Sequence, residues 1–293
     1  MKIDQYGASA SDSVGRVILE YKNKAGATVE KYTYLNSTST ADFTGLDVYV
    51  PKDGSATVKM YIDVPTISAG ADSGDLPKLL YIYDQGFSAT GESSNTVETD
   101  DSGAAHLSGN AMIVRKTKPT VTLVSLPSTV LTDGTKVISK FTITADAAGP
   151  VYFKELNWTY ATTSGVDITD STIYLYRSGQ STALNSADSL SGDASPSIEV
   201  ALTTEEEIAA GSSQTYELKG TITGSQANRS FSTNLKESAS AATAGTSTTY
   251  ANLAVYETGG LLWSDGADTD RASDYADCHY VKSLPTDSQT MTQ

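Results

Sequence analysis

The chain has 293 residues and is poor in the side chains that build reactive sites. It contains one cysteine, Cys278, and two histidines, His106 and His279. A single thiol can form neither an internal disulfide nor, alone, a zinc site. Adjacent residues of a strand point to opposite faces, so Cys278 and His279 would not form a nucleophile-base pair. No Gly-x-Ser-x-Gly turn precedes either histidine. We therefore expect no enzymatic activity.

Cations and long apolar runs are also scarce. Lys and Arg total 20 against 35 Asp and Glu, which gives a formal charge of −15 and a pI near 4.4. Nucleic-acid binding needs clustered cations, so we expect no nucleic-acid partner. No apolar run approaches the ~20 residues that cross a bilayer, and Met1–Ala10 lacks the basic start and apolar stretch of a signal peptide. We expect a chain that does not span a membrane, with an N-terminus left by processing or by an internal cut.

The composition that remains is typical of β-strands. Tyr occurs 17 times, against 5 Phe and 2 Trp, beside abundant Val, Ile and Thr. Such side chains suit half-exposed pleated surfaces. Gly, Ser, Thr, Asp and Asn interrupt nearly every window and compete with helical hydrogen bonds. The one helix candidate is Thr204–Ala209, in which Glu205–Glu207 suggest a solvated turn or cap.

An internal repeat organises the chain. Apolar residues alternate within its strands, as at Val17, Leu19 and Tyr21, so one face can enter a core. Short strands bounded by Gly, Asp and Ser predict an antiparallel sandwich. The predicted fold is all-β, with two tandem immunoglobulin-like antiparallel β-sandwich domains. The first copy comprises Val14–Asn23, Phe43–Val50 and Gly54–Val64, and the second comprises Ser171–Ser178, Ser197–Leu202 and Gly211–Ile222.

A basic cluster that ends at Pro119 predicts a domain boundary within Arg115–Thr120. We assign the first domain to residues 1–116, the second to 117–262, and an Asp-rich loop with a C-terminal strand to 263–293. Three expected strands precede the second copy, whereas the first copy begins at Val14. We therefore expect the first domain to lack its leading strands and to present an unpaired edge.

The C-terminus offers a strand for that edge. His279–Pro285 resembles Met112–Pro119, because both lead from a short apolar strand through a basic residue to a proline. The tail would begin another domain in the next copy of the chain, and repeated head-to-tail contacts would give a filament or sheet. A truncated fragment with a frayed tail is the alternative. The residues expected to mediate assembly are Tyr280, Val281, Leu284, Pro285 and Met291.

The closing segment carries a family resemblance. Its motifs are Leu262–Asp265, Ser273–Tyr275, Tyr280–Lys282 and Leu284–Pro285. The segment resembles the end of large Ser/Thr-rich surface proteins of Candidate Phyla Radiation bacteria, or Patescibacteria, and the second domain is similar to their repeated Ig-like modules. Tyr275 departs from an expected Trp and His279 from an expected Gly. The resemblance implies a cell-surface or envelope location and no particular chemistry.

Carboxylates gather in the loop of the closing segment. Asp265, Asp268, Asp270 and Asp274 lie at loop spacing, and calcium prefers such hard oxygen ligands. The loop lacks the EF-hand pattern, and Asp in a Gly-rich turn commonly forms local hydrogen bonds. Calcium and purely local bonding both remain open, and no other cofactor is expected.

Paired aromatics offer one further site. Trp158 with Tyr160, and Tyr174 with Tyr176, share a strand face, which suits a sugar-stacking platform but fits a core layer better. We predict a structural subunit of an extracellular cell-surface assembly, a filament, tube or surface layer, joined head to tail by β-strand complementation. Its partners would be copies of itself or other surface proteins, and its Ser and Thr could carry glycans. The alternative is a surface adhesin or carbohydrate-binding module.

Overall fold

A computed structural model shows two compact units, Met1–Arg115 and Lys116–Gln293. The sequence places this boundary after residue 116. Strands dominate both units, and the described residues contain no α-helix, only the 3-10 turn η1 (Ile67–Ala69). The all-β class of tandem antiparallel sandwiches is thereby confirmed. The described residues are 2–5, 12–82, 87–99, 107–110, 112–186, 190–191, 196–237, 259–267 and 281–293, with backbone only for 2–5 and 190–191.

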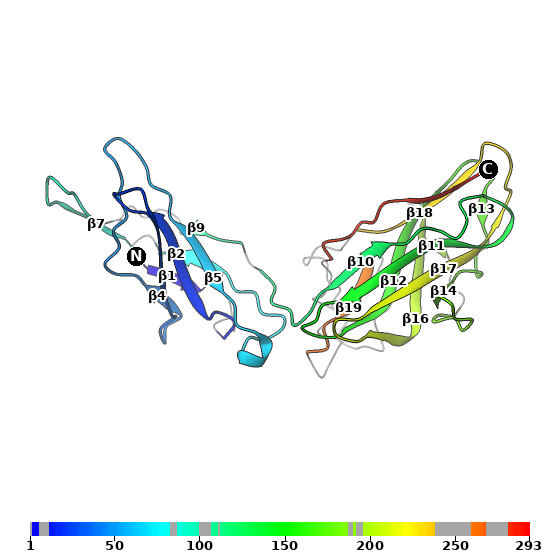
Figure 1. Ribbon diagram of the computed structural model, residues 1–293, viewed down its shortest axis with the longest axis horizontal. Helices are drawn as coiled ribbons and strands as arrows, with labels where there is room; N and C mark the ends of the chain where they lie inside the picture. The colour runs from blue at the N-terminus through cyan, green and yellow to red at the C-terminus, as the bar shows by residue number, and fades with distance from the viewer. Residues whose placement is uncertain are drawn as a thin grey trace. The chain divides into compact units, whose positions relative to one another are not determined.

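The first unit contains two small sheets and a hairpin (Figure 1). Its strands are β1 (Lys2–Gln5), β2 (Arg16–Lys22), β3 (Thr28–Thr33), β4 (Thr40–Asp42), β5 (Lys59–Asp63), β6 (Leu79–Tyr81), β7 (Ser88–Thr90), β8 (Val97–Thr99) and β9 (Leu107–Ser108). One sheet has the order β4-β1-β6-β9, the other has the order β3-β2-β5, and β7 pairs with β8. All pairs are antiparallel.

Alternation along β2 builds the core of the first unit. Val17, Leu19 and Tyr21 are buried, and Ala41 and Phe43 pack with them. The outward residues of β2 between them are only partly buried, as the sequence pattern predicts. The cluster of buried side chains is much smaller than that of the second unit.

One sequence prediction for the first unit is wrong. Phe43–Val50 forms no strand but a single bridge between Asn23 and Val48, because Gly45 adopts a left-handed φ of 61° that interrupts extended backbone. The N-terminal strand β1 lies between β4 and β6 and is paired on both sides. That the first unit lacks leading strands and presents an unpaired edge stays a prediction.

The second unit is a larger sandwich of two antiparallel sheets (Figure 1). Its strands are β10 (Pro119–Leu123), β11 (Gly134–Ala145), β12 (Val151–Thr162), β13 (Asp167–Ile168), β14 (Tyr174–Arg177), β15 (Leu190–Ser191), β16 (Ser197–Ile208), β17 (Ser213–Thr223), β18 (Ser230–Leu235), β19 (Leu261–Ser264) and β20 (Gln289–Thr292). One sheet has the order β10-β11-β17-β13, with β14 also on β17. The other has the order β15-β16-β12-β18-β20, with β19 also on β12.

Aromatic side chains from both sheets meet in the core of the second unit. Phe141 and Tyr216 come from one sheet, and Phe153 and Trp158 come from the other. The ring centroids of Phe141 lie 5.8 Å from Trp158 and 5.7 Å from Tyr216, and Phe153 lies 5.4 Å from Tyr216. All four residues are fully buried. The two edge-to-face contacts join the layers, whereas the stacked contact of Phe141 with Tyr216 lies within one sheet.

The predicted helix at Thr204–Ala209 is wrong, because these residues continue β16 to Ile208. In the pairing of β12 with β16, Val151 lies opposite Ile208 and Phe153 lies opposite Glu206. Pairing with a long neighbouring strand thus outweighs the local helix propensity of three consecutive glutamates. Glu206 points inward rather than forming part of a solvated turn.

Candidate functional site

The segment predicted to mediate assembly completes the second unit of its own chain. β20 pairs antiparallel with β18, with Phe231 opposite Met291 and Ser232 opposite Thr290. Figure 1 shows the red C-terminal segment running beside the yellow β18. Thr292 also forms a parallel bridge to Val130. The sequence places this tail in the next copy of the chain, whereas the structure places it on the edge of its own sheet.

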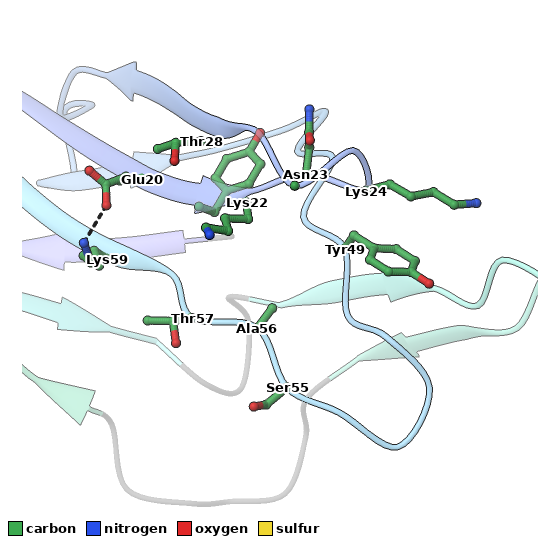
Figure 2. A pocket seen from close by; sticks show the side chains of 12 residues that line it. Glu20, Lys22, Asn23, Lys24, Thr28, Tyr49, Ser55, Ala56, Thr57 and Lys59 are labelled. Carbon is green, nitrogen blue, oxygen red and sulfur yellow. Dashed lines mark hydrogen bonds and ion pairs between the residues drawn. The ribbon is translucent and has the colours of Figure 1, made fainter.

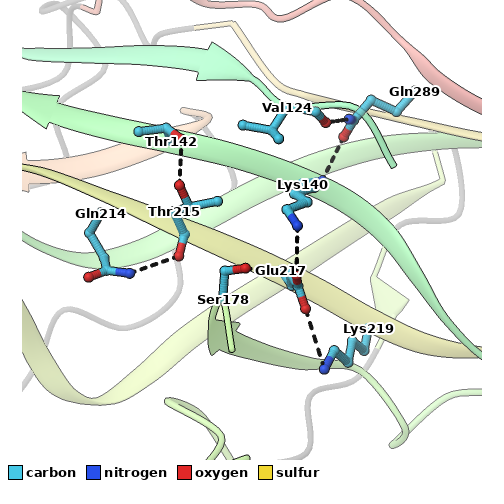
Figure 3. Close-up of polar contacts among 9 residues, drawn as sticks. All are labelled: Val124, Lys140, Thr142, Ser178, Gln214, Thr215, Glu217, Lys219 and Gln289. Carbon is cyan, nitrogen blue, oxygen red and sulfur yellow. Dashed lines mark hydrogen bonds and ion pairs between the residues drawn. The ribbon is translucent and has the colours of Figure 1, made fainter. Parts of the chain in front are cut away.

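Gln289 ties β20 to the opposite sheet (Figure 3). Its Oε1 accepts hydrogen bonds from Ser139 Oγ at 3.0 Å and from the backbone N–H of Lys140 at 2.8 Å. Its Nε2 donates to the backbone carbonyl of Val124 at 2.7 Å. The residue is 9% exposed, so these bonds satisfy polar atoms that would otherwise be costly to bury.

The predicted assembly residues gather in the core of the second unit as far as the structure describes them. Val281 and Met291 belong to that core, and Leu284 packs against it. Leu284–Pro285 is a cis peptide bond. Tyr280 lies outside the described residues. In the isolated chain these residues hold the second unit together.

The carboxylate of Asp265 accepts hydrogen bonds from the backbone of its own unit. The residue is fully buried. Its Oδ2 accepts a hydrogen bond from the backbone N–H of Lys116 at 2.8 Å, and its Oδ1 accepts one from Ala267 at 3.1 Å. This carboxylate therefore joins the start of the second unit to the turn after β19. Asp268, Asp270 and Asp274 lie outside the residues that the structure describes. Among the described residues, no three or more potential metal ligands cluster together.

A polar row crosses the outer face of the β11–β17 sheet (Figure 3). Glu217 accepts hydrogen bonds from Lys140 Nζ and Ser178 Oγ, each at 2.9 Å, and Lys219 Nζ lies 3.5 Å from its second oxygen. Burial acts to raise the pKa of Glu217, but the bonds and charges of these partners outweigh it and lower the pKa. Thr142 and Thr215 share a further bond of 2.8 Å. These contacts link β11, β14 and β17.

Buried Glu206 is the centre of a charged network in the second unit, and the Arg177 side chain of that network is 48% exposed. Arg177 donates to its two oxygens at 2.6 and 2.8 Å, and Tyr216 Oη donates to Oε1 at 2.9 Å. Burial and the adjacent carboxylate raise the pKa of Tyr216 far above its usual range. The tyrosine therefore remains a hydrogen-bond donor, and the network acts as a structural connection between β14, β16 and β17.

A β-bulge in β12 decides which of its side chains enter the core of the second unit. The register of β12 shifts between Phe153 and Glu155 against both β16 and β19. The extra residue keeps Leu156 and Trp158 in the core with Phe153. Glu155 and Asn157 therefore face the other side of the sheet, where they are still only 3% and 1% exposed. Asn157 Nδ2 donates to Glu155 Oε1 at 2.7 Å and to the carbonyl of Gly259 at 2.8 Å. The Asn157-Trp-Thr159 sequon is therefore closed to glycosylation in the folded chain.

The two aromatic pairs that the sequence suggests as sugar-stacking platforms differ in burial. Trp158 is fully buried and donates to Ser139 Oγ at 3.3 Å, and Tyr160 stacks on Phe231 at 5.9 Å. This pair belongs to the core, as its structural interpretation predicts. Tyr174 and Tyr176 lie 6.4 Å apart on β14, at the surface.

The first unit has a cavity at the end of β2, with a volume of about 430 Å³ (Figure 2). Glu20, Lys22 and Lys59 line it from the two strands β2 and β5. Lys59 Nζ lies 2.7 Å from Glu20 Oε1. Lys24 and Tyr49 complete one wall, with the ammonium 5.8 Å from the ring centroid. Sequence analysis missed this cavity because its wall joins Tyr49 and Ser55–Thr57 to the end of β2, a contact that sequence periodicity does not show.

The described residues show no assembled catalytic group. His106, Cys278 and His279 lie outside them. Nor does any described segment form a helix with the length and apolar character that a bilayer crossing requires.

The two units thus define an all-β protein of tandem antiparallel sandwiches. No protein-family model matches the chain, and no curated protein matches it. Among solved structures it is similar to the full-length major pilin RrgB of Streptococcus pneumoniae, at 13% identity and a TM-score of 0.24, covering 80% of this chain and 41% of that one. A structure described as a membrane anchored protein of Corynebacterium diphtheriae matches at 9% identity and a TM-score of 0.20, covering 80% and 51%. The chain spans about half of these proteins or less, and scores of this size establish no shared function.

Proposed function

We propose that this protein is a structural subunit of an extracellular cell-surface assembly, in which copies join head to tail by exchange of β20. The observation that carries the proposal is the position of β20. It is a short strand at a sheet edge, yet it supplies Met291 to the core and Gln289 to the opposite sheet. A terminal strand that completes a core can be supplied by the same copy or by the next one.

Composition supports an exterior location for such a subunit. A charge of −15 keeps a Ser/Thr-rich surface soluble. The likeness of Leu262–Asp265 and the segments after it to surface proteins of Patescibacteria agrees with this location and is part of the proposal. The same proposal includes other surface proteins as partners and calcium as a ligand of the loop after Asp265.

A disulfide experiment tests the exchange of β20. Ser232 and Thr290 are directly opposite across β18 and β20, so cysteines at both positions can form a disulfide without moving the backbone. The chain would carry Ser232→Cys and Thr290→Cys, together with Cys278→Ser to remove the native thiol. If copies exchange β20, oxidation of the concentrated protein gives a ladder of covalent oligomers on a non-reducing denaturing gel.

The outcomes separate the two parts of the proposal. A matched control with Ser232→Cys and Cys278→Ser alone yields dimers at most. A single monomer band with filaments in electron micrographs would refute strand exchange but not assembly. A monomer band with a monomeric mass by light scattering at all concentrations would refute both.

A further inference from the structure

Three exposed tyrosines lie together on the outer face of the β3-β2-β5 sheet. Tyr32 is 59% exposed, Tyr34 is 64% exposed and Tyr61 is 43% exposed. Tyr32 and Tyr61 both pair with Ile18, which lies between them on β2. The inward residues of β2 fill the core, so this row faces away from it. The sheet therefore presents a flat aromatic surface, which we call the tyrosine face.

Charged neighbours hold the tyrosine face in place. The guanidinium carbon of Arg16 lies 5.0 Å from the ring centroid of Tyr32, and Tyr34 meets Tyr32 edge to face at 6.2 Å. Arg16 Nη2 lies 2.6 Å from Asp63 Oδ2, with the side chains 40% and 47% exposed. The pair thus orders the ring while keeping polar atoms open to a hydroxylated ligand.

The tyrosine face lies next to the cavity of the first unit. Glu20 and Lys59 form the next outward row after Ile18 and Tyr61, and both line the cavity. Three lysines and one glutamate are its charged lining residues. Lys59 pairs with Glu20 and Lys24 with Glu92, whereas Lys22 forms no ion pair within the described part of the chain. In a protein of charge −15, this unpaired lysine offers the cavity a positive charge that can pair with an anionic group.

We propose that the tyrosine face and this cavity bind an acidic polysaccharide, with sugar rings stacked on Tyr32 and Tyr61 and a sugar carboxylate at Lys22. Neighbouring strands lie roughly 5 Å apart, so the two rings on the flanking strands stand about 10 Å apart. Two residues of an extended β-linked glycan rise by a similar length. Carbon-hydrogen faces of sugars stack on aromatic rings, and their hydroxyls can bond to Arg16 and Asp63.

The cavity lining favours a glycan over another protein. Asn23, Thr28 and Thr57 contribute an amide and two hydroxyls to the wall, which can bond to sugar hydroxyls. The core of a protein interface would instead need an apolar, well-packed patch. This site lies on the first unit and does not depend on the exchange of β20.

Binding of matched oligosaccharides to the full chain tests the proposal. The probes are a β-1,4-linked mannuronate hexamer and the neutral β-1,4-linked mannose hexamer, compared by isothermal titration calorimetry. We expect the mannuronate to bind more tightly. The double variant Tyr32→Ala with Tyr61→Ala weakens binding of both probes about tenfold or more, and Lys22→Gln reduces mannuronate binding to the level of the neutral probe.

Two controls and three contrary results complete the test. Lys52→Gln removes an exposed cation elsewhere in the first unit, and Tyr176→Ala removes a surface tyrosine of the second unit. Both leave binding unchanged, and far-UV circular dichroism confirms folding of every variant. No binding of mannuronate at millimolar concentration would overturn the proposal. Binding that survives the double tyrosine variant would also overturn it, as would loss of self-association in that variant without any glycan binding.

Discussion

At the scale of single residues, two carboxylates of the second unit differ in what they face. Glu217 lies on the outer face of the sheet among Lys140, Ser178 and Lys219. Glu206 is buried, and Arg177 and Tyr216 Oη occupy its two oxygens. Removing one partner of a buried charged network leaves an uncompensated group, whereas an outer-face pair is partly screened by water. The same residue type therefore has two different structural roles within one unit.

The Lys140–Glu217 pair predicts a pH-dependent coupling energy. The pKa of Glu217 is lowered in the folded chain, because its partners outweigh the effect of burial. Such a carboxylate contributes stability above its unfolded pKa, and the contribution is lost as the pH falls through the folded pKa. A double-mutant cycle of Lys140→Gln and Glu217→Gln should give a coupling of about 1 kcal/mol at neutral pH.

The same cycle at acid pH provides the check. The coupling should fall toward zero as the pH drops through the lowered folded pKa of Glu217, where its carboxylate becomes protonated. Urea unfolding of the four proteins, followed by tryptophan fluorescence, measures it. A coupling that stays constant from neutral to acid pH would show that the pair contributes through packing and not through charge.

At the scale of elements, β20 and the bulge of β12 determine how the second unit closes. The bulge keeps Leu156 and Trp158 in the core and turns Glu155 and Asn157 to the opposite face of β12, where they bond to each other. β20 covers the edge of β18, so that strand is paired on both sides over part of its length. An edge covered in this way is closed to other chains until β20 leaves it.

The burial of Met291 leads to a prediction about how much β20 contributes to the stability of the second unit. Met291→Ala removes a side chain that is 1% exposed, and it should lower the unfolding free energy of the second unit by about 2–4 kcal/mol. Thr290→Ala, at the neighbouring exposed position, should change it by less than about 0.5 kcal/mol. Equal effects of the two substitutions in urea unfolding would contradict the position of β20 in the core.

At the scale of the whole molecule, the two units should unfold as separate transitions. They have separate cores, and the core of the first unit is much smaller. Because burial of apolar area supplies most of the stabilising free energy, the first unit should unfold at the lower temperature. Both tryptophans, Trp158 and Trp263, lie buried in the second unit, so their fluorescence reports that transition alone.

Matched core substitutions assign the transitions in calorimetry. Leu19→Ala in the first unit and Leu218→Ala in the second each remove a fully buried side chain, at a cost of about 2–5 kcal/mol. The first should shift only the lower transition, and the second only the transition that tryptophan fluorescence follows. A single transition shifted equally by both substitutions would mean that the units unfold cooperatively.

Sequence patterns predict the regular strands of this chain well. Alternating apolar residues indicate β2 and β5, and the three strands expected before the second copy correspond to β10, β11 and β12. The pattern fails where pairing or a bulge overrides it. Thr204–Ala209 has helical propensity but pairs with β12. The bulge of β12 reverses which of its side chains face the core, so Leu156 and Trp158 enter it and Glu155 does not.

The sequence alone determined that this protein is an acidic, all-β chain of two tandem sandwiches, since period-two alternation and turn residues act over a few neighbouring positions. Only the tertiary structure decided which strands pair with one another and which side chains share a face. β1 is flanked on both sides, β20 pairs with the β18 of its own chain, and Tyr32 and Tyr61 lie on either side of Ile18 of β2. Strand order and register bring together residues that are far apart in sequence. Local periodicity does not reveal either of them.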